Sequence, residues 1–187
     1  LIERMGSGAP TSLYTTGNPD ILLNSGLGLI CSVSCPGSIV IRTFDAIRIL
    51  RDKPMTLIGG FHSPMERDCL DLWLSGSQPV IFCPAKSLRN LSMGKAARKA
   101  LAKGRLLMLS PFDDRVRRTT VAQAICRNDM VAALSDVIFV PHASIHGKTW
   151  AAVQKAFQRC GDIPFVFLNH LSNQPHVRVL SHPSASF

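Results

Sequence analysis

The first feature of this sequence that could bind a ligand is a pair of glycines followed by the start of a helix. The apolar run over residues 55–58 ends at Gly59 and Gly60, and a helical pattern then begins with Ser63 as the N-cap candidate and Glu66 three positions later. The first turn of a helix leaves backbone N–H groups unpaired, and glycines let another group approach them closely. The turn therefore predicts a binding site for a phosphate or a carboxylate. A plain strand-to-helix connection that binds nothing is the alternative.

The side chains of this turn offer two kinds of chemistry. His62 can donate a hydrogen bond to a phosphate. Glu66 either caps the helix by accepting backbone N–H groups, or serves as an acid in cleaving the glycosidic bond of a nucleotide. Ser63 lacks the Gly-x-Ser-x-Gly context of a hydrolase nucleophile, which disfavours a catalytic triad. We predict no catalytic residue and expect a binding protein rather than an enzyme.

Arg127 and Asn128 are the other candidates for contact with an anion. Both lie inside a segment with a helical pattern. Arg127 needs no special role there, because a long arginine side chain can extend from a buried helix face to water. Asparagine, in contrast, is a mediocre helix former. Its presence therefore indicates a hydrogen-bonding task for Asn128.

The cysteine and histidine residues do not form a metal-site pattern. Cys31 and Cys35 have no second Cys or His pair at zinc-finger spacing, and His142 and His146 lie between a proline and a glycine, where no helix face would hold both. Most of the six cysteines lie inside apolar segments of a chain without an export signal, so we expect free, mostly buried thiols. No metal and no other cofactor is predicted.

An excess of positive charge indicates polyanionic partners. Lys and Arg outnumber Asp and Glu by 21 to 12, giving a formal net charge of +9, and residues 72–112 contain no acid at all. In a helix, four basic residues of this window would share one face. We predict that they form a DNA-facing patch, although a solvated helix face is the alternative. These residues are Lys95, Arg98, Lys99 and Lys103.

Alternating apolar and helical segments predict the fold. Apolar runs typical of buried strands cover residues 27–33, 55–58, 79–83, 105–109, 137–140 and 163–168. Helical patterns cover residues 39–51, 64–74, 94–103, a segment from Thr119 or Thr120 to residue 134, and 148–160. This order predicts an α/β fold: a doubly wound, mostly parallel, Rossmann-like sheet with helices on both faces.

Three turns of small residues should meet at one edge of this sheet. They follow the strands that end near residues 33, 60 and 140, and ligands of open α/β sheets bind outside the carboxyl ends of the strands. We therefore predict one phosphate-binding site for nucleotide or DNA. Its predicted residues are Ser32, Ser34, Gly59, Gly60, His62, Ser63, Arg127, Asn128, Gly147 and Thr149.

The chain is expected to contain one domain. We divide it into an N-terminal arm over residues 1–13 without a role in the fold, the Rossmann-like domain over 14–170, and a C-terminal tail over 171–187 that is rich in His, Pro and Ser. No apolar run reaches the ~20 residues of a membrane span, and no leader pattern is present. A cytoplasmic protein without membrane contact is the expectation.

Several segments resemble motifs of the DNA-processing protein A family (DprA/Smf). The run Arg127–Asp136 is similar to that family's Arg-Asn-Arg run, which ends in Leu-Ser-Asp before a strand. The Gly59–Glu66 turn looks like a variant of its Ser-Gly-x-Ala-x-Gly-Ile-Asp turn, and Gly17-Asn18-Pro19 resembles its approach to the first strand. Gly147 and Thr149 are similar to residues of its Ser-Gly-x-x-x-Thr segment.

The resemblance spans residues 14–169 and carries implications for function. It implies a Rossmann-like domain that binds single-stranded DNA, assists the loading of a RecA-type recombinase in DNA uptake and recombination, and self-associates. Two cations of the family pattern are absent. Cys31-Ser32-Val33 stands where the family has Gly-Ser-Arg, and Asp129 replaces the second Arg of Arg-Asn-Arg.

Two other functions use the same predicted site. A nucleotide phosphoribohydrolase would employ Arg127 and Glu66, because related lonely-guy hydrolases place a Gly-Gly turn, an Arg and a Glu around a nucleoside monophosphate. A small-nucleotide sensor would bind the same ligand without reaction and without use for the basic helix face.

Overall fold

The computed structural model describes residues 1–144, 147–159, 163–168 and 177–180. Its strands are β1 (Tyr14–Gly17), β2 (Gly26–Leu29), β3 (Thr56–Gly59), β4 (Val80–Phe82), β5 (Leu106–Ser110), β6 (Val137–Val140), β7 (Phe165–Leu168) and β8 (Val177–Leu180). Its α-helices are α1 (Ile2–Met5), α2 (Gly37–Leu50), α3 (Pro64–Leu74), α4 (Lys95–Ala102), α5 (Val121–Leu134) and α6 (Lys148–Arg159). Short 3₁₀ turns cover Gly6–Gly8 and Pro19–Leu23.

The described strands form one sheet in the order β1-β5-β4-β3-β2-β6-β7-β8. All neighbouring pairs are parallel except the two at the ends, β1 with β5 and β7 with β8. The chain steps outward from β2 to β5 and then returns to place β6 against the free side of β2. This confirms the predicted doubly wound fold and puts the ends of β3, β2 and β6 side by side at the switch point.

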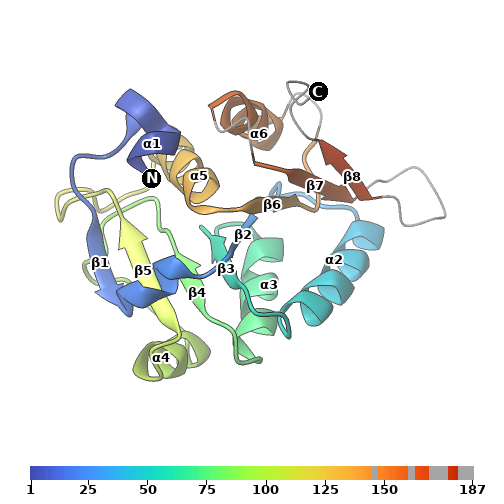
Figure 1. The fold of residues 1–187 in the computed structure, drawn as a ribbon, viewed down its shortest axis with the longest axis horizontal. Coiled ribbons are helices and arrows are strands. Elements are labelled where there is room, and N and C mark those ends of the chain that lie inside the picture. The colour runs from blue at the N-terminus through green and yellow to red at the C-terminus, as the bar shows by residue number, and fades with distance from the viewer. Residues whose placement is uncertain (145–146, 160–162, 169–176, 181–187) are drawn as a thin grey trace.

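Helices cover both faces of the sheet, as Figure 1 shows. Successive strand residues point to opposite faces. Val80 and Leu106 pack in the apolar cluster that contains α2, α3 and α4 residues, whereas Ile81 and Leu107 pack in the cluster that contains α5 and α6 residues. Near-continuous apolar strands are therefore buried on both sides, which is what a parallel sheet requires.

Glycines in β2 let the end of α5 approach the sheet. A Cβ placed on Gly28 would lie 2.4 Å from Ser135 Oγ, and one on Gly26 would lie 2.6 Å from the Ile58 Cδ1 atom. Ser135 Oγ donates to Val131 O at 2.7 Å, and Asp136 Oδ2 accepts from Gly26 N at 2.9 Å. The end of α5 is thus fixed directly against the central strand, and α5 is the helix that carries Arg127.

The N-terminal segment contributes to the fold, contrary to the expectation of an uninvolved arm. Leu1 and Met5 pack against the α5 side of the core. Arg4 Nη1 donates to Ser135 O at 2.6 Å and to Ala133 O at 3.2 Å. A cation at the C-terminal end of a helix is favoured by the helix dipole. The segment over residues 1–13 shows no periodicity from which this contact could have been predicted.

The edge strands were also absent from the prediction. All four residues of β1 are exposed, so the strand carries no apolar signal and is held by pairing with β5. Strand β8, which pairs with β7, lies inside the segment predicted to be a tail rich in His, Pro and Ser. The rest of that tail, apart from 177–180, and the predicted helix end at Cys160 lie outside the described residues.

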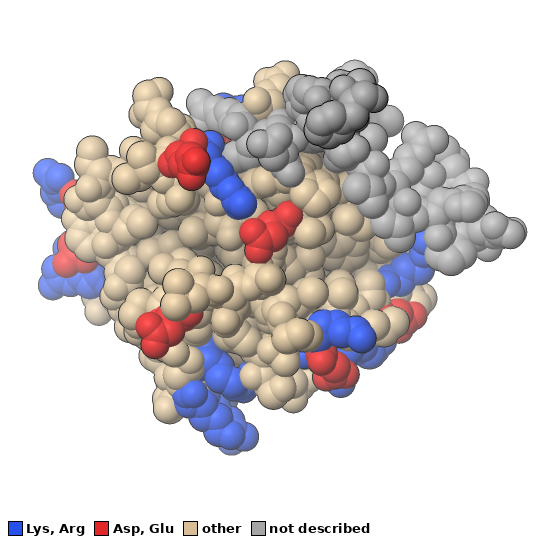
Figure 2. Space-filling model, in the orientation of Figure 1, with Lys and Arg blue, Asp and Glu red and all other residues tan. Residues whose placement is uncertain are grey.

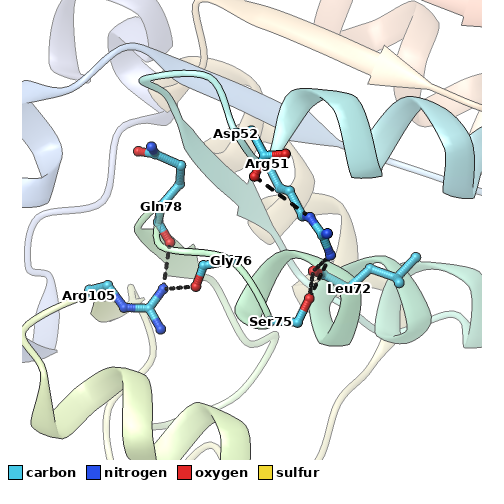
Figure 3. A network of polar contacts seen from close by, with 7 residues as sticks. All are labelled: Arg51, Asp52, Leu72, Ser75, Gly76, Gln78 and Arg105. Atoms are coloured by element: carbon cyan, nitrogen blue, oxygen red, sulfur yellow. Dashed lines mark hydrogen bonds and ion pairs between the residues drawn. The ribbon is translucent and has the colours of Figure 1, made fainter.

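Two arginines hold the connection between α3 and β4 (Figure 3). Arg51 Nη1 donates to Ser75 Oγ at 2.7 Å and to Leu72 O at 3.3 Å, at the C-terminal end of α3. Arg105 Nη1 donates to Gly76 O at 3.0 Å. These arginines satisfy backbone carbonyls at the amino ends of β4 and β5, the edge opposite to the predicted ligand site.

The described part of the chain contains free thiols and no metal cluster. Cys31, Cys35, Cys69, Cys83 and Cys126 are unpaired, and burial raises the pKa of the Cys69 and Cys83 thiols to about 12. No three His, Cys, Asp or Glu side chains within it could jointly hold a metal ion. None of its helices has the length and apolarity of a membrane span.

The close packing at β2 predicts that Gly28→Ala destabilises the protein. The added methyl would meet Ser135, and overpacking of this kind costs about 1–3 kcal/mol. Gly37→Ala is the matched control, because a Cβ at this first residue of α2 has no atom within 4 Å. Urea unfolding would show a lower midpoint for Gly28→Ala only. Equal stability of the two variants would contradict the packing described for α5.

Candidate functional site

A cavity of about 180 Å³ opens at the carboxyl ends of the central strands, between α3, α5 and α6. One side is polar and includes four of the predicted residues, His62, Ser63, Arg127 and Asn128. Thr149 of α6, a fifth predicted residue, also lines it. Five of the ten predicted site residues thus line one cavity at the switch point.

The turn before α3 is closed by its own carboxylate. Ser63 Oγ accepts from Glu66 N at 3.2 Å, and Glu66 Oε2 accepts from Ser63 N at 3.2 Å and from His62 N at 2.7 Å. Glu66 Oε1 accepts from the N–H of Cys31, in the loop after β2, at 2.9 Å. An internal anion thus occupies the amides that were expected to bind a phosphate. The His62 and Ser63 amides are therefore not free to donate to a phosphate in this structure.

Arg127 fills the space that Gly60 leaves open. A Cβ on Gly60 would lie 1.2 Å from Arg127 Nη1, so a larger residue there would displace the guanidinium. Gly59 is likewise needed for close packing, because its Cβ would meet the Phe61 ring at 2.8 Å. The glycine pair was expected to admit a ligand. It admits side chains of the protein itself.

The Arg127 guanidinium is a buried cation without a direct carboxylate partner among the described residues. Arg127 is only 6% exposed. Its Nε donates to Asn128 Oδ1 at 2.7 Å, and Nη1 makes a long contact of 3.5 Å with Cys83 O. Burial lowers the pKa of Arg127 from its ordinary value, and the negative charge of Glu66 opposes this only in part. An anion in the cavity would supply the missing counter-charge.

Ser32 joins the turn after β2 to the turn after β6. Ser32 is buried; its N–H donates to His142 O at 2.9 Å, and its Oγ accepts from Ser144 N at 3.4 Å. Gly147 N donates to Ser144 O at 2.8 Å just before α6 begins. These contacts shape the loops, and neither Ser32 nor Gly147 lines the cavity. Ser34, which is exposed, does not line it either. His146 lies outside the described residues.

Several lining residues were missed by sequence reasoning. Lys148, the first residue of α6, lines the cavity next to Thr149 and is exposed. Its position directly after Gly147, in a turn already predicted to face the ligand, was the available signal. The apolar wall includes Ile30, Val33 and Val121, of which Val33 and Val121 are 68% and 57% exposed. Apolar side chains near the ends of strands and helices are common in any fold, so these residues could not be assigned to a cavity from the sequence.

The four basic residues of α4 lie away from the cavity. Lys95, Arg98, Lys99 and Lys103 are all exposed, and Ala100 is the buried residue of that helix. Helix α4 packs with α3 and β5 on the broad face of the sheet, and none of the four residues lines the cavity. Figure 2 shows basic side chains projecting at the lower margin of the molecule, where Figure 1 draws α4.

The structural role of Glu66 predicts that Glu66→Gln lowers stability. An amide supplies one acceptor oxygen where the carboxylate accepts three backbone N–H groups, so charge-assisted bonds are lost at a cost of about 2 kcal/mol. Glu3→Gln makes the same chemical change at an exposed position and should leave the free energy of unfolding unchanged. Urea unfolding of both variants measures the difference. Wild-type stability in Glu66→Gln would mean that these bonds do not hold the turn.

Comparison with known proteins identifies relatives by structure rather than by sequence. No protein-family model matches the chain, and no curated protein matches it by sequence. The chain is similar to DNA processing protein A from Helicobacter pylori, whose structure is described as showing a unique single-stranded DNA binding mode. The TM-score is 0.73 at 19% identity, covering 89% of this chain and 75% of that one.

Two further solved structures have related folds. DNA processing protein A (DprA) from Streptococcus pneumoniae matches with a TM-score of 0.72 at 17% identity, covering 89% of this chain but only 58% of that protein. A molybdenum cofactor binding protein from Rippkaea orientalis matches with a TM-score of 0.54 at 14% identity, covering 78% of this chain and 77% of that one. The chain therefore has a DprA-like fold, as the sequence motifs predicted, and identities this low show the fold alone.

Proposed function

On this DprA-like fold, we propose that the chain binds single-stranded DNA, with one phosphate held in the cavity beside Arg127. The observation that carries the proposal is the buried guanidinium, which has no ion pair with any described residue and faces a cavity. The nearby charge of Glu66 offsets the cost of burying this cation only in part, so the arrangement favours an anionic ligand.

Neighbouring donors suit a phosphate. The side-chain amide of Asn128 accepts from Arg127 through its oxygen, which leaves its NH₂ group free to donate. Lys148 adds a second cation at the start of α6, where the helix dipole also favours negative charge. His62 supplies a ring nitrogen from the turn before α3. With the turn amides taken by Glu66, recognition rests on these side chains rather than on backbone N–H groups.

The apolar wall suits the base or sugar of the same nucleotide. Val33 and Val121 are exposed at the cavity rim, and Ile30 and Ile125 lie deeper in it. A nucleotide has an anionic end and an apolar face, and binding buries both. Non-specific binding of single strands needs this combination of charge and contact with the base faces.

The related Helicobacter protein and the charge of the chain support DNA as the polymer. That protein is described as binding single-stranded DNA. The formal net charge of +9 favours a polyanion over a neutral or cationic partner. Assistance to a RecA-type recombinase in DNA uptake and recombination, and self-association of the chain, belong to the same proposal and rest on the family resemblance.

A nucleotide-cleaving enzyme is less well supported. Both oxygens of Glu66, the acid that such chemistry would need, are engaged by three backbone N–H groups. A small-nucleotide sensor has one specific observation in its favour, the modest volume of about 180 Å³. Each alternative has its own test. Release of free base from a nucleoside monophosphate would indicate the enzyme. Tight binding of mononucleotides without binding of oligonucleotides would indicate the sensor.

The proposal predicts that Arg127→Met weakens oligonucleotide binding. Methionine fills much of the same space but removes the charge, so a loss of about 1.5–3 kcal/mol, roughly 10- to 100-fold in Kd, is expected. Arg48→Met is the matched control, because Arg48 is an exposed α2 residue paired with Asp45. Fluorescence anisotropy with a labelled oligo-dT at two NaCl concentrations measures both. Undetectable or salt-independent binding by the wild type, or equal losses in the two variants, would contradict the proposal.

A further inference from the structure

We infer that the DNA strand leaves the Arg127 cavity along the carboxyl edge of the sheet toward β4 and β5, and that Lys86, Arg117 and Arg118 contact its phosphates. This inference rests on the proposed function and goes beyond it, because it assigns a path and makes the ligand longer than one nucleotide. It names as phosphate contacts three residues that the sequence did not single out.

The three cations lie on the same edge as the cavity. Strands β3, β4 and β5 are parallel neighbours, so the loops that follow them open at one edge. Lys86 follows β4, and Arg117 and Arg118 follow β5. The two loops are joined, because Ser87 N donates to Val116 O at 2.8 Å and Ser110 Oγ donates to Lys86 O at 2.8 Å.

The cavity and these loops lie close together. Arg127 Nη1 contacts the carbonyl oxygen of Cys83, the first residue after β4, and Lys86 lies three positions further on. Val121, which lines the cavity, follows Arg118 by three positions, a reach of at most about 10 Å. Adjacent strands are separated by about 4.8 Å, so loops on β3, β4 and β5 are near neighbours. A strand of several nucleotides can therefore touch all of them.

The local acids do not cancel this charge. Asp113 pairs with Arg115, with an Nη2–Oδ2 distance of 2.5 Å, and Asp114 pairs with Arg89 at 3.6 Å. Lys86, Arg117 and Arg118 remain without an ion pair to any residue that the structure describes. In Figure 2, basic and acidic side chains lie together at the left margin, where Figure 1 draws the loop between β5 and α5.

The α4 face does not lie on this path. Helix α4 packs with α3 and β5, and Figure 1 draws it at the start of β5, opposite to the arrowhead that marks the carboxyl end, so its basic residues lie away from the carboxyl edge. A DNA strand following the edge would pass Lys86 and the β5 loop without contacting Lys99 or Lys103. The four basic residues on and next to α4 then form a solvated helix face, the alternative to a DNA-facing patch.

The test compares two double variants that each remove two positive charges: Arg117→Ala/Arg118→Ala on the edge and Lys95→Ala/Lys99→Ala on α4. All four residues are exposed, so both variants should fold, and thermal melting checks this. Kd is measured for dT20 and for dTMP over a series of NaCl concentrations. Each phosphate contact on a single strand contributes about 0.7 to the slope of log K against log salt concentration.

We expect the edge variant to bind dT20 about tenfold more weakly, with a salt slope smaller by about 1.4, and to bind dTMP like the wild type. The α4 variant should keep the wild-type slope. The inference is overturned if the edge variant keeps the wild-type slope for dT20, or if the α4 variant shows the larger loss. Failure of the wild type to bind dT20 at all overturns both the path and the proposed function, whereas Arg127-dependent binding with an unchanged edge variant overturns the path alone.

Discussion

The arrangement at the switch point depends on one close approach: the Arg127 guanidinium lies where a side chain of residue 60 would be. Glu66, below the same turn, accepts N–H groups from both β2 and the turn before α3 and so fixes their separation. Together these contacts place a buried cation and a buried carboxylate in the lining of one cavity. Because Arg127 makes no ion pair with a described residue, the cation remains available to a ligand.

This geometry determines which groups are left to contact an anion in the proposed site. In many open α/β sheets, the amides at a helix N-terminus after a glycine-rich turn bind the phosphate. Here Glu66 accepts the His62 and Ser63 N–H groups, and the proposed phosphate contacts therefore come from side chains of α5 and α6, chiefly Arg127, Asn128 and Lys148. Val33 and Asp129 stand where the DprA pattern has arginines, so the proposed DNA contacts use cations at other positions, including the loops after β4 and β5.

Local periodicity made the fold predictable, and long-range contacts limited the prediction of the site. Helix Pro64–Leu74 and strand Val137–Val140 match the predicted limits because apolar spacing and the Ser63 cap are local signals. The reach of Glu66 to Cys31 spans 35 positions, and no pattern near either residue encodes it. The exposed strand β1 and the N-terminal Arg4 contacts escaped for the same reason, since neither has an apolar period.

The central claim is that Arg127 binds a phosphate, and NMR of its side chain tests this most directly. The Nε–H of Arg127 donates to Asn128 Oδ1 in a buried position, which should slow its exchange with water and make its ¹⁵N–¹H signal observable. Addition of oligo-dT should shift this signal, and the shift should saturate together with binding measured by anisotropy. An unshifted Arg127 signal at saturating oligo-dT would contradict the account, because the DNA would then bind without occupying the cavity.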